Sequence, residues 1–229
     1  VSTFFVFSDY TKPMARLSAL MKMPLTFVFT HDSIGVGEDG PPHEPIEQLA
    51  MLRAMPNFRV FRPCDATETS AAWLTAVTSK ETPTALVLSR QNLAPIAGSS
   101  KDALKGGYVI DDCEGTPDAI LIASGSEVEL AVKSKEALAA EGMKVRVVSM
   151  PCMELFEEQS AEYKEAVLPK NVRKRVAIEA LSDFGWGRYV GLDGGYVCMK
   201  GFGASAPAAK LFEKFGFTVE NVVNTVKEL

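Results

Sequence analysis

Short apolar runs alternate with amphipathic stretches along most of the chain. The spacing of apolar residues predicts strands at Leu25–Thr30, Arg59–Phe61, Ala85–Leu88, Ala119–Ala123, Val145–Ser149, Val176–Ile178 and Tyr196–Met199. Two further sets of residues share one face at helical spacing: Ile46, Leu49, Ala50 and Ala54, and then Val128, Ala131, Val132, Lys135 and Leu138. Strands and helices that alternate at this spacing indicate βαβ units, so the predicted fold class is α/β with mainly parallel sheets.

The stretch Gln91–Gly107 interrupts this alternation. It is rich in Gly, Pro and Ser and has little periodicity, which is typical of a linker. We therefore predict two domains, at residues 1–97 and 108–229. The second shows a complete alternation of strands and helices, whereas the first looks truncated at its N-terminal edge. Since the sequence also starts without Met, we expect it to be part of a longer polypeptide.

The composition narrows the class of protein. Of the 229 residues, 47% are hydrophobic and 23% charged, which is typical of a globular protein with a sizeable core. The net charge of −5 argues against a nucleic-acid partner, and we expect the basic run Lys170–Arg175 to be a solvated edge. The four cysteines form no C-x-x-C pair, so neither a disulfide framework nor a zinc site is predicted. Scattered, reduced cysteines lead us to expect a cytoplasmic protein. No apolar run approaches the ~20 residues that cross a bilayer.

The candidate chemistry is concentrated in one loop, between a predicted strand and a predicted helix at Glu44–Met55. The only two histidines, His31 and His43, lie here with Asp39 between them. Glycines in the loop permit close approach of the backbone to a ligand. In open α/β sheets, ligands bind beyond the carboxyl ends of the strands, so the loop is well placed for a binding site.

These side chains suit a polyhydroxylated, carbonyl-bearing substrate better than a metal. We expect His43 to lie at the start of the helix, where the helix dipole favours a neutral imidazole that can hydrogen-bond a ligand oxygen or amino group. Asp39 would accept a hydrogen bond from a hydroxyl. The spacing of the histidines matches no common zinc motif, so no metal ligand is predicted. The alternative is a polar surface loop whose histidines cap helices.

Two other features have both a functional and a structural interpretation. Arg90 ends a predicted strand, where its guanidinium would bind a phosphate or carboxylate, or else form a structural ion pair. Phe4, Phe7 and Tyr10 recur at every third residue, which fits either a wall for a flat heterocycle or part of the core. Near helix starts, Ser126 is predicted to form a capping box with Glu129, and Ser205 to cap a helix.

Taken together, these features resemble the transketolase family. Residues 31–48 match its signature loop almost residue for residue. The agreement continues through Arg62–Asp65, Leu88–Leu93, Gly107–Val109, Ala123–Val128, Val147–Pro151 and Phe202–Pro207, and so spans the chain. The resemblance implies two three-layer α/β/α domains: part of the thiamine-diphosphate-binding fold that holds the cofactor's pyrimidine, and a Rossmann-like C-terminal domain. Pro42 departs from the family, which usually has Thr at this position.

The resemblance also implies a function. Enzymes of this family use thiamine diphosphate and Mg²⁺ to move a two-carbon ketol (glycolaldehyde) unit from ketose phosphates to aldose phosphates, in the pentose phosphate pathway. By analogy, Phe4, Phe7 and Tyr10 would surround the pyrimidine ring. His43 would be catalytic and would also contact the donor sugar. The other implied substrate contacts are Asp39 at the C2 hydroxyl and His31 and Arg90 at the phosphate end.

In the family, the cofactor lies between the two subunits of a homodimer, and the metal ligands, the diphosphate site and an essential glutamate lie upstream of these residues. We therefore expect this chain to be the C-terminal portion of such an enzyme, inactive without an N-terminal diphosphate-binding half. The alternatives are one half of a split enzyme or a non-catalytic dimerisation module. The double-histidine loop argues against the related deoxyxylulose-phosphate synthases and 2-oxoacid dehydrogenase β-subunits.

Overall fold

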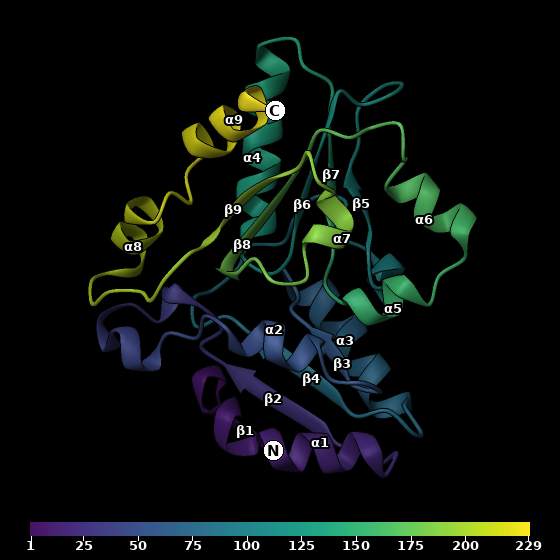
Figure 1. Ribbon diagram of the computed structural model, residues 1–229, viewed down its shortest axis with the longest axis vertical. Coiled ribbons are helices and arrows are strands. Elements are labelled where there is room, and N and C mark those ends of the chain that lie inside the picture. Colours follow the sequence, from purple (N-terminus) through teal and green to yellow (C-terminus); the bar gives the residue numbers. More distant parts are fainter.

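The computed structural model describes residues 1–229 as two α/β domains (Figure 1). The first contains a parallel sheet of four strands in the order β1-β2-β4-β3. Phe4, Thr30 and Leu88 are aligned across β1, β2 and β4, so the carboxyl ends of these strands meet at one edge. The strands are β1 (Ser2–Phe4), β2 (Thr26–Thr30), β3 (Arg59–Phe61) and β4 (Thr84–Leu88).

Helices cover both faces of this first sheet. Phe29 and Val87 point toward α1 (Ser8–Leu20) and α2 (Gln48–Arg53), where they pack in a buried cluster with Leu49. The alternate residue Leu86 points to the other face and packs with Ala72 of α3 (Ala66–Thr78). The strand residues therefore alternate between two apolar layers, as expected for a sheet that is buried on both sides.

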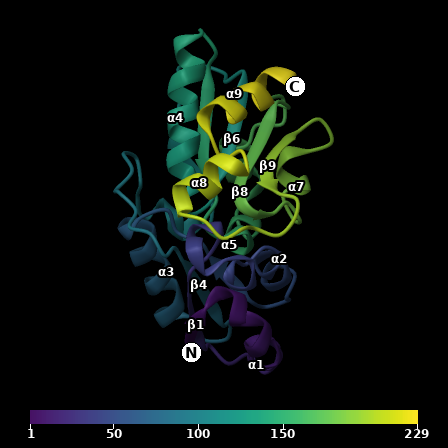
Figure 2. The same ribbon diagram turned by 90° about the vertical axis from the view of Figure 1, so that its left-hand side faces the viewer.

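The second domain contains a five-stranded sheet in the order β5-β7-β6-β8-β9, in which only β5 is antiparallel to its neighbour. The strands are β5 (Tyr108–Asp111), β6 (Ala119–Ala123), β7 (Val145–Ser149), β8 (Arg175–Ser182) and β9 (Gly195–Met199). On one face lie α4 (Glu127–Ala140) and α9 (Val219–Glu228), with α8 (Ala208–Lys214) beside them; on the other lie α5 (Met153–Glu157), α6 (Ala161–Val167) and α7 (Gly187–Val190). Figure 2 shows the sheet between α4 and α7.

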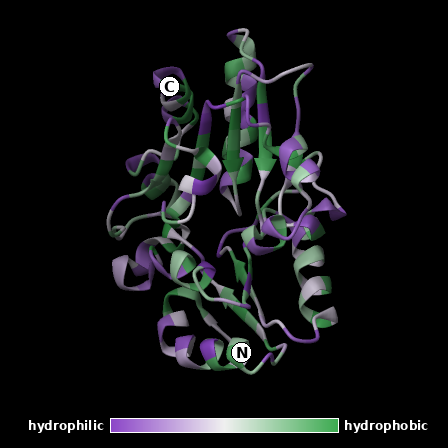
Figure 3. Ribbon diagram, turned by 45° about the vertical axis from the view of Figure 1, so that its right-hand side comes forward, coloured by the Kyte–Doolittle hydropathy of each residue, from purple (hydrophilic) through white to green (hydrophobic).

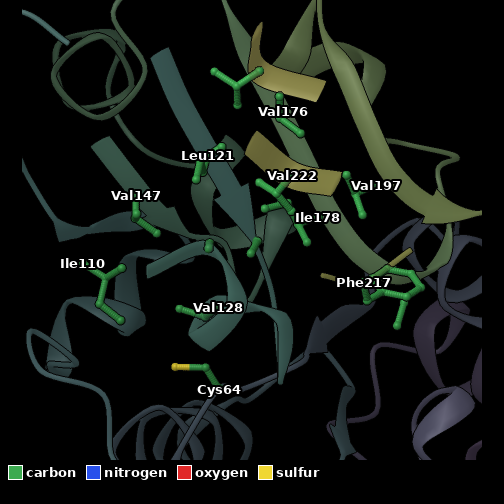
Figure 4. Packing of buried hydrophobic residues seen from close by; sticks show 14 of the residues in the cluster. Cys64, Ile110, Leu121, Val128, Val147, Val176, Ile178, Val197, Phe217 and Val222 are labelled. Atoms are coloured by element: carbon green, nitrogen blue, oxygen red, sulfur yellow. The ribbon is translucent and has the colours of Figure 1, made fainter. Parts of the chain in front are cut away.

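The core of the second domain extends into the first. Figure 4 shows Leu121, Val147 and Ile178 pointing toward Val128 of α4, with Cys64 reaching in from the first domain. Ile34 belongs to the same buried cluster. In Figure 3 hydrophobic colouring follows the strands of this domain, while the surrounding helices are mixed. The predicted fold class, two three-layer α/β domains with mainly parallel sheets, is confirmed.

The seven predicted strands are all present, and β1 and β5 were not predicted. β1 has only three residues, and β5 is an antiparallel edge strand that directly follows the linker. The predicted helix at Glu44–Met55 is wrong in its start, because α2 begins at Gln48. Pro45 explains why Glu44 is not helical: the residue before a proline is pushed out of the helical region, and Glu44 has φ −91° and ψ 107°. The buried face of α2 is correspondingly Leu49 and Leu52, while Ala54 is exposed.

Both predicted serine caps are also wrong. Ser126 itself has helical dihedrals and its hydroxyl donates to the Glu127 carboxylate, so it caps no backbone N–H. Ser205 lies ahead of α8, whose N-cap is Pro207, and donates to the backbone carbonyl of Glu38 in the other domain. The four cysteines are unpaired, and no helix has the length and apolar character needed to span a membrane.

Candidate active site

The candidate site lies at the carboxyl edge of the first sheet. The loop that follows β2 forms two short 3₁₀ helices, η2 (Ile34–Asp39) and η3 (Pro41–His43). Since Phe4 and Leu88 are aligned with the last residue of β2, Phe4, His31 and Arg90 leave three neighbouring strands at the same edge. The topology thereby brings together residues from three separate parts of the sequence.

Five aromatic rings form one connected array at this edge. The ring of Phe4 stacks on His31 with centroids 3.7 Å apart and planes 18° apart. Phe7 lies 6.4 Å from Phe4 and 6.0 Å from Tyr10, and the ring of His43 meets Phe7 edge-on at 5.8 Å. Tyr10 is 83% exposed and Phe4 and Phe7 are half-buried, so the interpretation of this row as part of the core is wrong. The array presents an aromatic surface that continues into both histidines.

His31 has an unusual backbone conformation. Its φ is +62°, in the left-handed region that few residues other than glycine adopt. The ring nitrogen Nδ1 lies 2.9 Å from the hydroxyl oxygen of Thr30. Partial burial and the positive charge of Arg90 lower the pKa of His31, while Asp39 and Asp32 oppose the shift. The imidazole is therefore held in one place and favours its neutral form.

His43 lies in η3, and its Nδ1 is 3.3 Å from the backbone carbonyl oxygen of Asp39. Because α2 begins five residues later, at Gln48, the expected position at a helix start is wrong and the argument from the helix dipole has no basis. The alternative that the histidines cap helices is also not observed. The cap of η2 is Ser33, whose hydroxyl accepts from the N–H of Gly35.

The second domain contacts the loop between the histidines and holds it in place. The Ser205 hydroxyl donates to the carbonyl of Glu38 at 2.7 Å. Gly40 has φ +78°, and a Cβ there would lie 3.2 Å from the Cβ of Ser205, so the position favours glycine on two grounds. The carboxylate of Asp39 lies on the exposed side of this loop.

Arg90 is exposed and has no carboxylate within 4 Å. The structural ion pair that was its alternative interpretation is therefore not present. Its charge acts on His31, which places it within electrostatic range of the loop. Nowhere in the chain do three or more His, Cys, Asp or Glu side chains come together in a way that could hold a metal ion.

A buried charge cluster behind the loop was not foreseen from the sequence. Arg62 is fully buried; its Nε lies 2.9 Å from Asp32 Oδ2 and its Nη1 lies 2.5 Å from Glu127 Oε2. Glu179 accepts two hydrogen bonds from Arg53, at 2.8 and 3.0 Å. Asp32, Arg62 and Glu127 each lie in a motif that matches the family, which was the only signal that these charges differ from ordinary surface residues.

Glu44, beside His43, is a second unforeseen residue. It is 2% exposed, neither carboxylate oxygen has a hydrogen-bond partner, and a Cβ on Gly203 would lie 1.7 Å from its Oε2. Burial raises the pKa of Glu44 to about 7. The carboxyl group is thus enclosed between the two domains.

Comparisons with known proteins cover the whole fold. Residues 1–95 match the family model "Transketolase, pyrimidine binding domain", and residues 106–218 match "Transketolase-like TK C-terminal domain". The transketolase of Bacillus subtilis (strain 168) is 59% identical over 232 residues, which are 99% of this chain and 35% of that protein. The structure of transketolase from Leishmania mexicana is 51% identical with a TM-score of 0.95, and the match covers 100% of this chain and 33% of that one.

A structure described as a split gene transketolase, inactive beta4 tetramer, is also similar. It is 26% identical with a TM-score of 0.81, and the match covers 99% of this chain and 74% of that chain. The chain therefore spans about a third of the length of the curated relatives that it matches, and most of the length of this split-gene protein.

Proposed function

The chain belongs to the transketolase family, and on that premise we propose that it supplies the pyrimidine-binding and C-terminal domains of an enzyme that transfers two-carbon ketol units between sugar phosphates. The proposed domain bounds are 1–97 and 108–229. The observation that carries the proposal is the aromatic array, because it joins a flat, partly exposed hydrophobic surface to both histidines of the family loop.

The array fits the pyrimidine half of thiamine diphosphate. Phe4, Phe7 and Tyr10 offer ring faces and edges on which a flat heterocycle can stack. When bound, the cofactor supplies a carbanion that accepts and releases the ketol unit. The family's need for Mg²⁺ is met, in this proposal, by residues outside this chain, since the chain itself gathers no metal-ligand cluster.

The polar residues around the array have distinct proposed roles. His43 contacts Phe7 edge-on and is proposed to be catalytic, exchanging a proton with the oxygens of the donor sugar. The carboxylate of Asp39 is exposed on the loop and accepts a hydrogen bond from the C2 hydroxyl. Arg90, exposed and without a carboxylate partner, binds the phosphate group together with His31.

We further propose that this chain works with an N-terminal diphosphate-binding half and in a homodimer, and that it is inactive alone. The coverage of about a third of the Bacillus enzyme supports the need for a further half. The similarity to a protein described as a split gene transketolase supports the specific case in which the two halves are separate polypeptides. The expected site of action is the cytoplasm, in the pentose phosphate pathway.

Reconstitution tests the proposal directly. The 229-residue chain is mixed with the separately expressed N-terminal remainder of the Bacillus enzyme, thiamine diphosphate, Mg²⁺, a ketose phosphate and an aldose phosphate. We expect ketol transfer from the mixture and none from either half. Arg90→Gln should raise KM for the phosphorylated substrates, whereas Arg173→Gln, an exposed arginine of the second domain, should not. If the mixture transfers ketol units equally fast when the chain carries His43→Ala, the assigned roles are contradicted.

A further inference from the structure

His31 adopts a conformation that its own sequence does not favour. A left-handed backbone at a residue other than glycine persists only when the surroundings enforce it. Two neighbours hold the ring: Phe4 stacks on it, and Thr30 lies within hydrogen-bond distance of Nδ1. Neither contact fixes the backbone on the C-terminal side of His31, so the constraint there comes from Asp32.

Asp32 is pinned by a buried cation. It is 1% exposed, and both Nε and Nη2 of Arg62 lie within 3 Å of its Oδ2, at 2.9 and 2.8 Å. The hydroxyl of Ser33 donates to the other oxygen at 3.3 Å. A carboxylate held at both oxygens cannot rotate, so the backbone that carries it is fixed immediately after His31.

Arg62 is in turn fixed by the second domain. Its Nη1 donates to Glu127 Oε2 at 2.5 Å and to the carbonyl of Ser124 at 2.8 Å. The guanidinium lies flat on the turn after β6, where a Cβ on Gly125 would be 2.7 Å from Cζ of Arg62. Glu127 is itself held, because its Oε2 accepts from the backbone N–H of Ala180 at 2.8 Å. The chain of contacts therefore runs from β8 through Glu127 and Arg62 to the residue after His31.

We propose that Glu127, on the second domain, is a positioning residue for His31 and acts through Arg62 and Asp32. When the carboxylate of Glu127 is removed, Arg62 loses an anionic partner and its guanidinium is no longer held in one direction. Asp32 is then freed. His31 relaxes toward an ordinary backbone conformation, and its ring leaves the face of Phe4. This coupling stands on the geometry alone. Its consequence, a weaker grip on the phosphate end of the sugar, rests on the function proposed above.

The chain contains a matched control for this test. Glu68 is also a buried carboxylate at the contact between the domains, where it accepts hydrogen bonds from Tyr108 at 2.9 Å and Ser149 at 2.6 Å. It makes no contact with Arg62 or Asp32. Glu68→Gln thus also removes a buried carboxylate at the contact between the domains, but should leave His31 unaffected.

Side-chain NMR of histidine gives the readout, because the chain has only two histidines and His43→Asn assigns them. In the parent chain, the stack on Phe4 should shift the His31 ring protons upfield. In Glu127→Gln we expect more than half of this shift to disappear. The pKa of His31 should rise toward its ordinary value, because the ring becomes more hydrated and moves away from Arg90. Glu68→Gln should leave both signals as they are.

Signals unchanged in Glu127→Gln, or altered equally in the two variants, would overturn the proposal. If Glu127→Gln does not fold, Glu127→Asp replaces it, because aspartate keeps the charge but is shorter by one methylene. Glu127→Asp should move the His31 signals in the same direction by a smaller amount. Unchanged signals in this variant would also overturn the proposal. A titration of each chain with fructose 6-phosphate separates the functional part. If His31→Asn binds the sugar phosphate as the parent does, the role of His31 fails while the measured coupling stands.

Discussion

The charged residues on the two sides of the His31–His43 loop differ in exposure and in ion pairing. On its outer side, Asp39 and Arg90 are exposed and form no ion pair with each other or with any other residue. On its inner side, Arg62 and Asp32 are buried and paired within 3 Å, and Glu127 completes the cluster from the other domain. Within the loop, the short 3₁₀ helix η2 separates the buried Asp32 from the exposed Asp39.

This difference separates the residues that we propose to bind substrate from the residues that hold the loop in place. A charge in water without a partner remains available to a ligand, whereas a buried charge must be paired because removal from water is costly. The inner cluster therefore fixes the loop, and the outer residues retain the freedom to meet a substrate. Each of the following predictions either disrupts this division or measures it more finely.

The largest expected effect comes from removing the centre of the inner cluster. Arg62→Met leaves the carboxylates of Asp32 and Glu127 buried without a cation, which should lower the free energy of unfolding by about 3–5 kcal/mol. Chemical denaturation followed by circular dichroism measures it. The matched control is Arg59→Met, whose partner Glu158 is 56% exposed and whose loss should cost less than about 1 kcal/mol. Equal losses in the two variants would mean that the buried ion pairs stabilise the fold no more than an exposed one.

The next largest effect is a loss of activity that leaves the stability of the fold unchanged. His43→Ala in the reconstituted enzyme should lower kcat by about a hundredfold or more, the usual contribution of a positioned acid or base. Since His43 is only half-buried, the unfolding free energy should change little. Steady-state kinetics and denaturation are measured on the same preparations. A large loss of stability with normal kcat would place His43 among the residues that hold the fold.

A smaller effect is expected from the aromatic array. Phe7 contacts Phe4, Tyr10 and His43, so Phe7→Ala removes the centre of the surface that we propose to bind the pyrimidine. We expect about tenfold weaker binding of thiamine diphosphate, from about 1.5 kcal/mol of lost ring contact. Calorimetric titration of the reconstituted enzyme measures this. Phe212→Ala, which removes a ring that pairs with Phe217 in the second domain, is the control and should bind normally.

The outer region was largely predictable from the sequence, and the inner one was not. The apolar runs revealed the buried strands because each strand is covered on both faces, as Val145–Ser149 illustrates. The cluster of His31, Asp39 and His43 was visible because its members are close in sequence. Arg62 and Glu127 are 65 positions apart, and a single arginine or glutamate in a sequence gives no sign that folding will bury it. The stack of Phe4 on His31 likewise depends on the pairing of β1 with β2.

The smallest effect tests a carboxyl group that belongs to neither region. Glu44 is buried like the inner cluster but unpaired like the outer residues, and burial raises its pKa from 4.5 to about 7. The folded protein therefore holds this proton more tightly than the unfolded chain does, so the stability that the group contributes below pH 4.5 is lost as the pH rises to about 7.

Glu44→Gln keeps the shape of the side chain and cannot ionise. Its unfolding free energy should therefore fall less than that of the parent between pH 5 and 8, by on the order of 1 kcal/mol. Denaturation curves at several pH values measure the difference, and Glu47→Gln, an exposed neighbour, should follow the parent. Identical pH profiles for the parent and Glu44→Gln would mean that the two domains separate enough at Gly203 to hydrate the carboxylate. The contact between the loop and the second domain near Gly203 would then be looser than the buried cluster of Asp32, Arg62 and Glu127.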